Sequence, residues 1–268
     1  MEDLIAVRGA RYARERVLDG VAEIGRVTLM LADAARLTVP ALRSFRLITQ
    51  QMAAIGVGSL WLVTVVSVFT GAVAAVQAAY QFSSVVPLKY IGAVIIRSVI
   101  IELGPVLTAL VVGGRVGASI AAELGTMKVT EQIDALRAMA INPIRYLVVP
   151  RLIASIVMLP VVTIFSNAIA IFGGYVVAVS TIGVSTHTYV LGLKQFFFLK
   201  ALSSGLLKSM FFGGIIGTMG CYYGFRTEGG AEGVGIATTR AVVGACVLVL
   251  ISDYLLANFF FRIIFTTE

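Results

Sequence analysis

The chain has 268 residues, of which 59% are hydrophobic and only 13% charged, with a mean hydropathy of +0.97 and a formal net charge of +7. Soluble domains carry about 25% charged residues, so this composition excludes an ordinary soluble domain and predicts a membrane protein with several spans. Two cysteines without CxxC spacing and a single histidine give no basis for a disulfide framework, a zinc site or a serine–histidine relay.

The first fifty residues differ in kind from the rest, because they carry eight arginines and contain no signal-peptide core. Apolar residues recur there at helical spacing in two groups on either side of Pro40, where the helix should break. The first group is Ile24, Val27, Leu31 and Ala35, and the second is Leu42, Phe45, Ile48, Met52 and Ile55. We expect residues 1–50 to form amphipathic helices along the headgroup plane. The alternative is a cytoplasmic helix packed on a partner protein.

Five segments are apolar for about twenty residues, the length needed to cross the hydrocarbon core. They cover residues 55–76, 91–112, 152–182, 201–225 and 241–265. The N-terminal segment and the loops after the second and fourth spans together hold fifteen of the 21 basic residues, so that side should face the cytoplasm. An odd number of spans then places the N-terminus in the cytoplasm and the C-terminus on the far side. The positive net charge is thus a topology signal and gives no reason to expect nucleic-acid binding.

A charged stretch interrupts the apolar sequence between the second and third spans. Apolar residues recur in it at i, i+4, i+7 and i+11, which predicts a short amphipathic helix. These residues are Val129, Ile133, Leu136 and Ala140. The helix should begin near Thr130, whose hydroxyl can cap it, with Glu131 in its first turn, and should end where Asn142 precedes Pro143. Such a helix either lies at the membrane interface or is the segment to which a soluble motor protein binds.

Glu102 is an ionisable residue inside the second span, and carboxylates in that position are costly enough to be functional candidates. Pro105 removes a backbone donor three residues later, so we expect a kink or break near it. Arg97 lies about 140° around the helix from Glu102, which is a poor position for an ion pair within one helix. The alternative for Glu102 is a helix–helix hydrogen bond with no role in transport.

Other polar residues in the spans suggest contacts between helices. Lys208 in the fourth span and Asp253 in the fifth carry opposite charges, and pairing would make both tolerable in the membrane. Contact with a substrate is the alternative role for these two residues. Asn167, deep in the third span, should hydrogen-bond a neighbouring helix. The run EGGAEGVG at residues 228–235 has no preceding strand, so we expect a flexible cytoplasmic loop and no nucleotide site.

Two stretches of sequence resemble a known family. Residues 102–143, ELGPVLTALVVGGRVGASIAAELGTMKVTEQIDALRAMAINP, resemble the signature of the MlaE/YrbE family of ABC transporter permeases, which move lipids in bacteria with an outer envelope and in chloroplasts. GVGIATTRAVV, residues 233–243, is similar to the loop before the last span in that family. The resemblance covers about residues 20–265. It implies an all-α integral membrane protein, with N-terminal interfacial amphipathic helices followed by a five-span permease domain over residues 51–268.

The resemblance also implies functional residues. A coupling helix around residues 126–142 would sit in a groove of an ATPase subunit, and the region around the second-span glutamate would line a lipid cavity near a homodimer interface. The coupling-helix candidates are Glu131, Gln132, Ile133, Asp134, Ala135 and Leu136, and the cavity candidates are Glu102, Leu103, Pro105 and Arg97. Ile101 stands where some family members carry arginine, which departs from the family pattern.

By this resemblance the chain is the permease subunit of an ATP-driven phospholipid transporter in the bacterial inner membrane, exchanging lipid with an MCE-type carrier towards or from the outer membrane. Its implied partners are a second copy of itself, an ABC ATPase, a periplasmic MCE-domain protein, a STAS-domain regulator and phospholipid. No GxxxxGK[ST] motif occurs in the sequence, so ATP and Mg²⁺ should be used by the partner subunit. We expect no catalytic residue, cofactor or metal in this chain.

Two other functions remain open from the residues alone. An ion-coupled carrier of lipid or small molecules is expected to show inverted repeats with paired broken helices. An intramembrane lipid-modifying enzyme would need a set of catalytic side chains that face one cavity.

Overall fold

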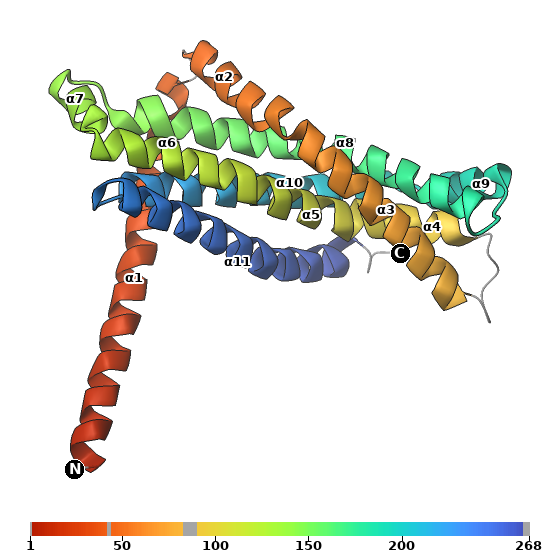
Figure 1. Cartoon of the computed structure of the whole chain (residues 1–268), viewed down its shortest axis with the longest axis horizontal. Helices are drawn as coiled ribbons and strands as arrows, with labels where there is room; N and C mark the ends of the chain where they lie inside the picture. The colour runs from red at the N-terminus through yellow and green to blue at the C-terminus, as the bar shows by residue number, and fades with distance from the viewer. Residues whose placement is uncertain (1, 42–43, 83–89, 265–268) are drawn as a thin grey trace.

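The computed structural model describes residues 2–41, 44–82 and 90–264, and every regular element in these ranges is helical. The long helices run side by side along one axis, except α1, which projects from one end of the bundle at a steep angle (Figure 1). The α-helices are α1 (Glu2–Ala41), α2 (Phe45–Ile55), α3 (Leu60–Phe82), α4 (Ile91–Ser98), α5 (Gly104–Val112), α6 (Ala118–Val129), α7 (Gln132–Ala138), α8 (Val149–Ser180), α9 (Thr186–Phe196), α10 (Leu199–Phe225) and α11 (Gly230–Ile264). The 3-10 turn η1 (Val57–Ser59) precedes α3, and the π-helical turns are η3 (Val99–Leu103), η4 (Gly113–Gly117) and η5 (Ile144–Val148).

Five helical segments in the described chain are long and apolar enough to cross a membrane, which confirms the predicted number of spans. They are Phe45–Gln81, Ile91–Val129, Ile144–Ser180, Leu199–Phe225 and Gly230–Arg262. Four of them extend further than predicted at the end of the bundle that carries α7. Hydropathy marks only the part of a helix that lies in hydrocarbon, whereas backbone hydrogen bonds carry the helix on beyond it.

The proline break in the N-terminal segment lies slightly later than predicted. α1 includes Pro40 and ends one residue after it, and α2 begins at Phe45; Leu42 lies outside the described residues. α2 then continues through η1 into α3 along nearly one line and packs on α8 (Figure 1). Ile48 and Ile55 are buried there, and the first candidate span begins at Phe45, so the described residues of the second apolar group are continuous with that span.

The glycine-rich run at residues 228–235 is mostly helical, so the prediction of a flexible loop was wrong. Gly229 and Gly230 have φ of 84° and 70°, a left-handed conformation that glycine adopts without steric cost, and they form the turn after α10. α11 begins at Gly230 and continues for 35 residues. Glu232 in its first turn favours a helix here, since a carboxylate interacts well with a helix N-terminus.

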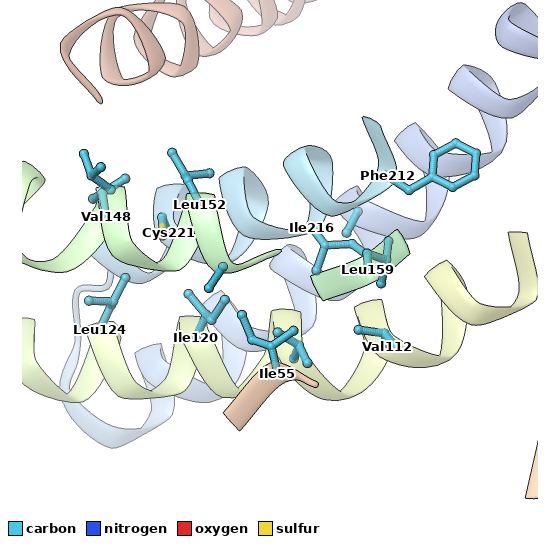
Figure 2. Close-up of a cluster of buried hydrophobic side chains, with 14 of the residues drawn as sticks. Ile55, Val112, Ile120, Leu124, Val148, Leu152, Leu159, Phe212, Ile216 and Cys221 are labelled. Carbon is cyan, nitrogen blue, oxygen red and sulfur yellow. The ribbon is translucent and has the colours of Figure 1, made fainter. Parts of the chain in front are cut away.

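The main hydrophobic core includes Ile133 of α7 and continues to the middle of the bundle. Figure 2 shows the part of it where side chains of α5, α6, α8 and α10 pack together. Leu124, Phe212 and Cys221 are fully buried in it. A smaller cluster around Ile95 and Tyr189 joins α4, α8 and α9 at the other end. The bundle thus has packed cores at two levels.

Close helix contact between α3 and α8 depends on glycine. A Cβ at Gly71 would collide with the backbone of Ala170, and a Cβ at Gly173 would collide with the backbone of Val68. Small residues allow this approach of backbones between helices in a membrane. The first and third spans are therefore held together by direct backbone packing.

Candidate functional site

α7 is the short helix between the second and third spans, and it is shorter than predicted. It covers Gln132–Ala138 rather than residues 126–142, because α6 continues the second span up to the turn before it. The Thr130 hydroxyl donates to the Thr126 carbonyl at 2.8 Å, so it does not cap α7 as predicted. Glu131 precedes the helix with a φ of 59° and is not in its first turn. This left-handed conformation is uncommon for a residue with a side chain.

The far end of α7 also differs from the prediction. The helix ends at Ala138, and Ala140 in the following turn has a φ of 58°. Asn142 comes later still, and its Oδ1 accepts a hydrogen bond from the backbone N–H of Ile144 at 2.9 Å. Asn142 therefore accepts a hydrogen bond from a backbone N–H group at the start of η5 and does not end α7. Left-handed residues thus stand on both sides of this helix.

The predicted contact residues of α7 divide into buried and exposed ones. Ile133 is fully buried and Leu136 is half-buried, so these two hold α7 against the bundle. The exposed residues are Glu131, Gln132, Asp134 and Ala135. Three of the four are polar, and they lie at the end of the molecule that carries α7 (Figure 1), where a soluble protein can reach them.

Asp134 links α7 to the end of α6. Its carboxylate lies 3.0 Å from Lys128 Nζ and 2.9 Å from a guanidinium nitrogen of Arg137. The hydrogen bond from Lys128, with the charge of Arg137, lowers the pKa of Asp134 below its ordinary value. Asp134 is therefore ionised at neutral pH and fixes the direction of the α7 surface.

A partly buried ion pair connects the two helices on either side of α7. Arg151 of α8 is 5% exposed, and its NH2 lies 2.9 Å from Oε2 of Glu123 in α6. Its NH1 also donates to the Leu147 carbonyl at 2.9 Å. This pair was not predicted, because both residues lie beyond the expected ends of the spans, where charges look like ordinary loop residues. It makes α6 and α8 one unit at the base of α7.

Three charged residues from three spans meet inside the bundle. Lys208 Nζ lies 2.7 Å from each carboxylate oxygen of Glu102 and 3.0 Å from Asp253 Oδ1. Lys208 is 1% exposed, whereas the Glu102 side chain is 43% exposed. The structure thus brings Lys208 and Asp253 together, and it adds Glu102 as a third member that sequence spacing did not connect to them. We call Glu102, Lys208 and Asp253 the charged triad.

The helix around Glu102 contains a π-helical turn and continues without a break. η3, which contains Glu102 and Leu103, is a π-helical turn directly before Gly104 and Pro105. Proline lacks the N–H that would bond the carbonyl four residues earlier, so a local rearrangement is expected there. Asn167 of α8 contacts Gly104, and its Oδ1 has no hydrogen-bond partner among the described residues. The expected interhelical hydrogen bond is thus not made by this oxygen.

A cavity of about 290 Å³ opens beside the charged triad, between α10, α11 and η3. Its lining residues are Ile101, Glu102, Ser204, Lys208, Tyr254, Ala257, Asn258, Phe260 and Phe261. Of the four cavity candidates, Glu102 lines it, whereas Pro105 is buried, Leu103 faces a narrow space beside α3, and Arg97 is exposed and does not line it. The cavity combines charged, polar and aromatic walls. In the described part of the chain, no group of three or more His, Cys, Asp or Glu side chains could hold a metal ion.

Comparison with known proteins gives consistent matches over most of the chain. Residues 48–259 match the sequence model of the family described as Permease MlaE. A probable ABC transporter permease protein of Rickettsia typhi is 44% identical over 217 residues, which cover 81% of this chain and 84% of that protein. A Synechocystis protein with the same description is 40% identical over 213 residues, 80% of this chain and 81% of that protein.

A chloroplast protein is also similar. The Arabidopsis thaliana protein TRIGALACTOSYLDIACYLGLYCEROL 1 is 37% identical over 213 residues, which cover 80% of this chain and 61% of that protein. The region that matches the family model, residues 48–259, contains all three residues of the charged triad and the helix α7 between the second and third spans.

Proposed function

Because the chain belongs to the MlaE family of ABC transporter permeases, we propose that it is the permease subunit of an ATP-driven phospholipid transporter. Membership of this family implies a transport subunit that works with an ATPase. The proposal adds the substrate class, the partners and the route. It places the chain in the bacterial inner membrane, with the N-terminus in the cytoplasm and the C-terminus in the periplasm.

The cavity beside the charged triad is the observation that carries the choice of phospholipid. A phospholipid joins a charged headgroup to apolar chains, and this cavity has Glu102 and Lys208 on one wall and Phe260 on another. Intramembrane charges are costly and are found where a pathway needs them. The name of the chloroplast relative refers to a galactosylated diacylglycerol, which carries no phosphate, so it supports a lipid substrate in general.

A second copy of the chain would complete the cavity. The most apolar windows of the first and fifth spans are only 28% and 22% buried, against 61% for the third span. The cavity opens along α11, which belongs to the less buried fifth span. A homodimer that meets through these spans would enclose lipid between the two copies.

The exposed surface of α7 is proposed as the ATPase contact. Gln132 and Asp134 are exposed on a helix that Ile133 anchors in the bundle, and Glu131 is exposed directly before it. A movement of α7 caused by the ATPase would be transmitted to α6 and α8, which the Glu123–Arg151 ion pair connects. ATP and Mg²⁺ would be used by the partner subunit. A periplasmic MCE-domain protein would pass the lipid to or from the outer membrane, and a STAS-domain protein would regulate the ATPase.

Reconstitution with the partner ATPase in liposomes tests this proposal. We expect ATP-dependent transfer of a fluorescent phospholipid to a soluble MCE-domain acceptor, and loss of transfer when the ATPase carries an inactivating substitution. Transfer that continues with the inactive ATPase and follows an ion gradient would favour an ion-coupled carrier instead. Chemical change of the lipid by the isolated chain would favour a lipid-modifying enzyme.

A further inference from the structure

A second large cavity lies at the end of the bundle that carries α7, far from the charged triad. It has a volume of about 630 Å³, opens to the surface and is lined by α1, the α7–η5 segment and the end of α10. Its lining residues are Arg26, Met30, Arg137, Ala140, Ile141, Asn142, Pro143, Ile144, Val148, Tyr222, Phe225 and Arg226. Three of these are arginines, none of the described lining residues is acidic, and most of the others are apolar. We call it the arginine cavity.

Two of the three arginines of this cavity, Arg137 and Arg226, are held by neighbouring side chains. Arg226 donates a hydrogen bond to the Tyr222 hydroxyl at 2.6 Å and lies 5.5 Å from the centre of its ring. Arg137 is held by Asp134 at 2.9 Å. Arg26 projects from α1 and, with Arg226, also lines an adjoining polar cavity of about 620 Å³. Guanidinium groups held in this way are suited to bind phosphate oxygens through paired hydrogen bonds.

The position of α1 sets the level of the arginine cavity in the membrane. Val27 and Leu31 lie on the other flank of α1 from Arg26, and they line an apolar groove of about 670 Å³ with α8 and α10. Along α10 this groove runs from Leu207 to Met219, or about 18 Å at the helical rise. Half of a bilayer's hydrocarbon core is about 15 Å thick, so the groove matches the depth of one leaflet. The arginine cavity then lies at headgroup level.

We propose that the arginine cavity binds the headgroup of an anionic phospholipid from the leaflet that faces α1. Arg26, Arg137 and Arg226 would bind the phosphate, and Met30 and Phe225 would contact the apolar part next to it. Basic pockets between helices at this level are suited to anionic headgroups. An acidic segment of a protein partner fits less well, because it would leave the apolar floor uncovered.

This lipid site is distinct from the proposed transport cavity. Arg226 follows Lys208 by 18 residues along α10, which separates the two sites by about 27 Å. A lipid held here would brace α7, because Arg137 and Ala140 form one wall of the arginine cavity. The inference therefore does not depend on which substrate the transporter moves.

Native mass spectrometry of the full chain in detergent tests the site. The probes are phosphatidylglycerol and phosphatidylcholine, added separately at equal concentration. We expect selective retention of phosphatidylglycerol, and an about 30-fold weaker retention in Arg26→Gln/Arg226→Gln, at roughly a factor of five for each arginine near a headgroup. Arg262→Gln is the matched control, because Arg262 is exposed in the last turn of α11 at the other end of the molecule.

A second variant and two competitors complete the test. Arg26→Lys/Arg226→Lys keeps the charge and should retain more phosphatidylglycerol than the glutamine variant, which separates loss of charge from loss of fold. Equal retention of both lipids, or equal loss in the Arg262→Gln control, would overturn the proposal. Displacement by millimolar inorganic phosphate would assign the site to free phosphate, and displacement by the ATPase subunit would assign it to a protein partner. Either result would also reject the lipid assignment.

Discussion

Asp134 and Lys208 each form ion pairs with two residues of opposite charge, but Asp134 is exposed and Lys208 is buried. The Asp134 side chain is 46% exposed, so water can replace a lost partner. Lys208 is 1% exposed in the middle of the spans, where water cannot do so. The same kind of charge pairing therefore orients the exposed helix α7 at one end of the molecule and connects three spans in its interior.

Replacement of the central lysine should have the largest effect. Lys208→Met leaves Glu102 and Asp253 close together without their shared cation. Removal of one partner from a buried ion pair costs about 3 to 5 kcal/mol. We expect a loss of unfolding free energy of this size, measured by denaturant titration in detergent. An unchanged midpoint would mean that Lys208 is hydrated in the membrane, and the contrast with Asp134 would fail.

A triple substitution sharpens the same comparison. Glu102→Gln/Lys208→Met/Asp253→Asn removes all three charges together, so no unpaired charge remains. We expect it to recover most of the stability that Lys208→Met loses, while phospholipid transfer in liposomes stays low. Recovery of both stability and transfer would limit the charged triad to a structural role.

Arg151→Met should have an intermediate effect, because its partner lies between the two extremes. Arg151 is buried but Glu123 is 50% exposed and can regain water. We expect a loss of about 1 to 3 kcal/mol in unfolding free energy, and weaker coupling of ATP hydrolysis to lipid transfer. Glu123→Gln is the matched comparison and should cost at least as much stability, since it leaves the buried Arg151 cation without a counter-charge although its bond to the Leu147 carbonyl remains.

Substitution on the α7 surface should leave the free energy of unfolding unchanged and weaken binding of the ATPase. Glu131→Ala/Asp134→Ala should not shift the unfolding midpoint measurably, since exposed ion pairs contribute little. We expect at least a tenfold loss of ATPase retained during purification. Glu232→Ala, which removes an exposed acidic residue from the first turn of α11, should retain the ATPase. Full retention by the double variant would place the ATPase contact elsewhere.

The smallest expected effect is the change in stability of α7 when pH is lowered. The pKa of Asp134 is lowered mainly by its hydrogen bond from Lys128, so its ion pairs stabilise α7 at every pH above the ordinary carboxyl value of 3.8. This contribution is lost as pH falls from 3.8 through the lower pKa of the folded protein. Hydrogen exchange of the α7 amides should therefore differ between wild type and Asp134→Asn at pH 5, and the difference should disappear at the acid end. A difference that persists there would exclude ionisation of Asp134 as its cause.

The sequence could predict the spans and the family because both depend on local patterns. Five apolar segments of sufficient length identify five spans whatever their packing. The partner of Glu102 could not be predicted in this way, because Lys208 is 106 residues away and the contact depends on how the spans pack. The cost of a membrane charge predicts that a partner exists but does not identify it.

Helix ends were the least predictable feature for a related reason. Thr130 has the right chemistry for an N-cap, but its hydroxyl bonds back to Thr126 in the helix before it. The run at residues 228–235 looks like a loop from its glycines, yet only Gly229 and Gly230 take a left-handed conformation, and Gly233 lies in the helix where a Cβ would collide with the Glu228 carbonyl. In each case a long neighbouring helix continued through residues that favour a break when they are considered alone.

The shared lysine also has a consequence for the order in which the protein is made. Glu102 is synthesised 106 residues before Lys208, and Asp253 follows 45 residues after that. At about 5 to 20 residues per second, the second span waits roughly 5 to 20 seconds for its counter-charge. During that interval the span holds an unpaired carboxylate, so it either takes up a proton or stays beside the insertion machinery. Arrival of the fourth span is therefore the step that allows the second span to settle in the bilayer.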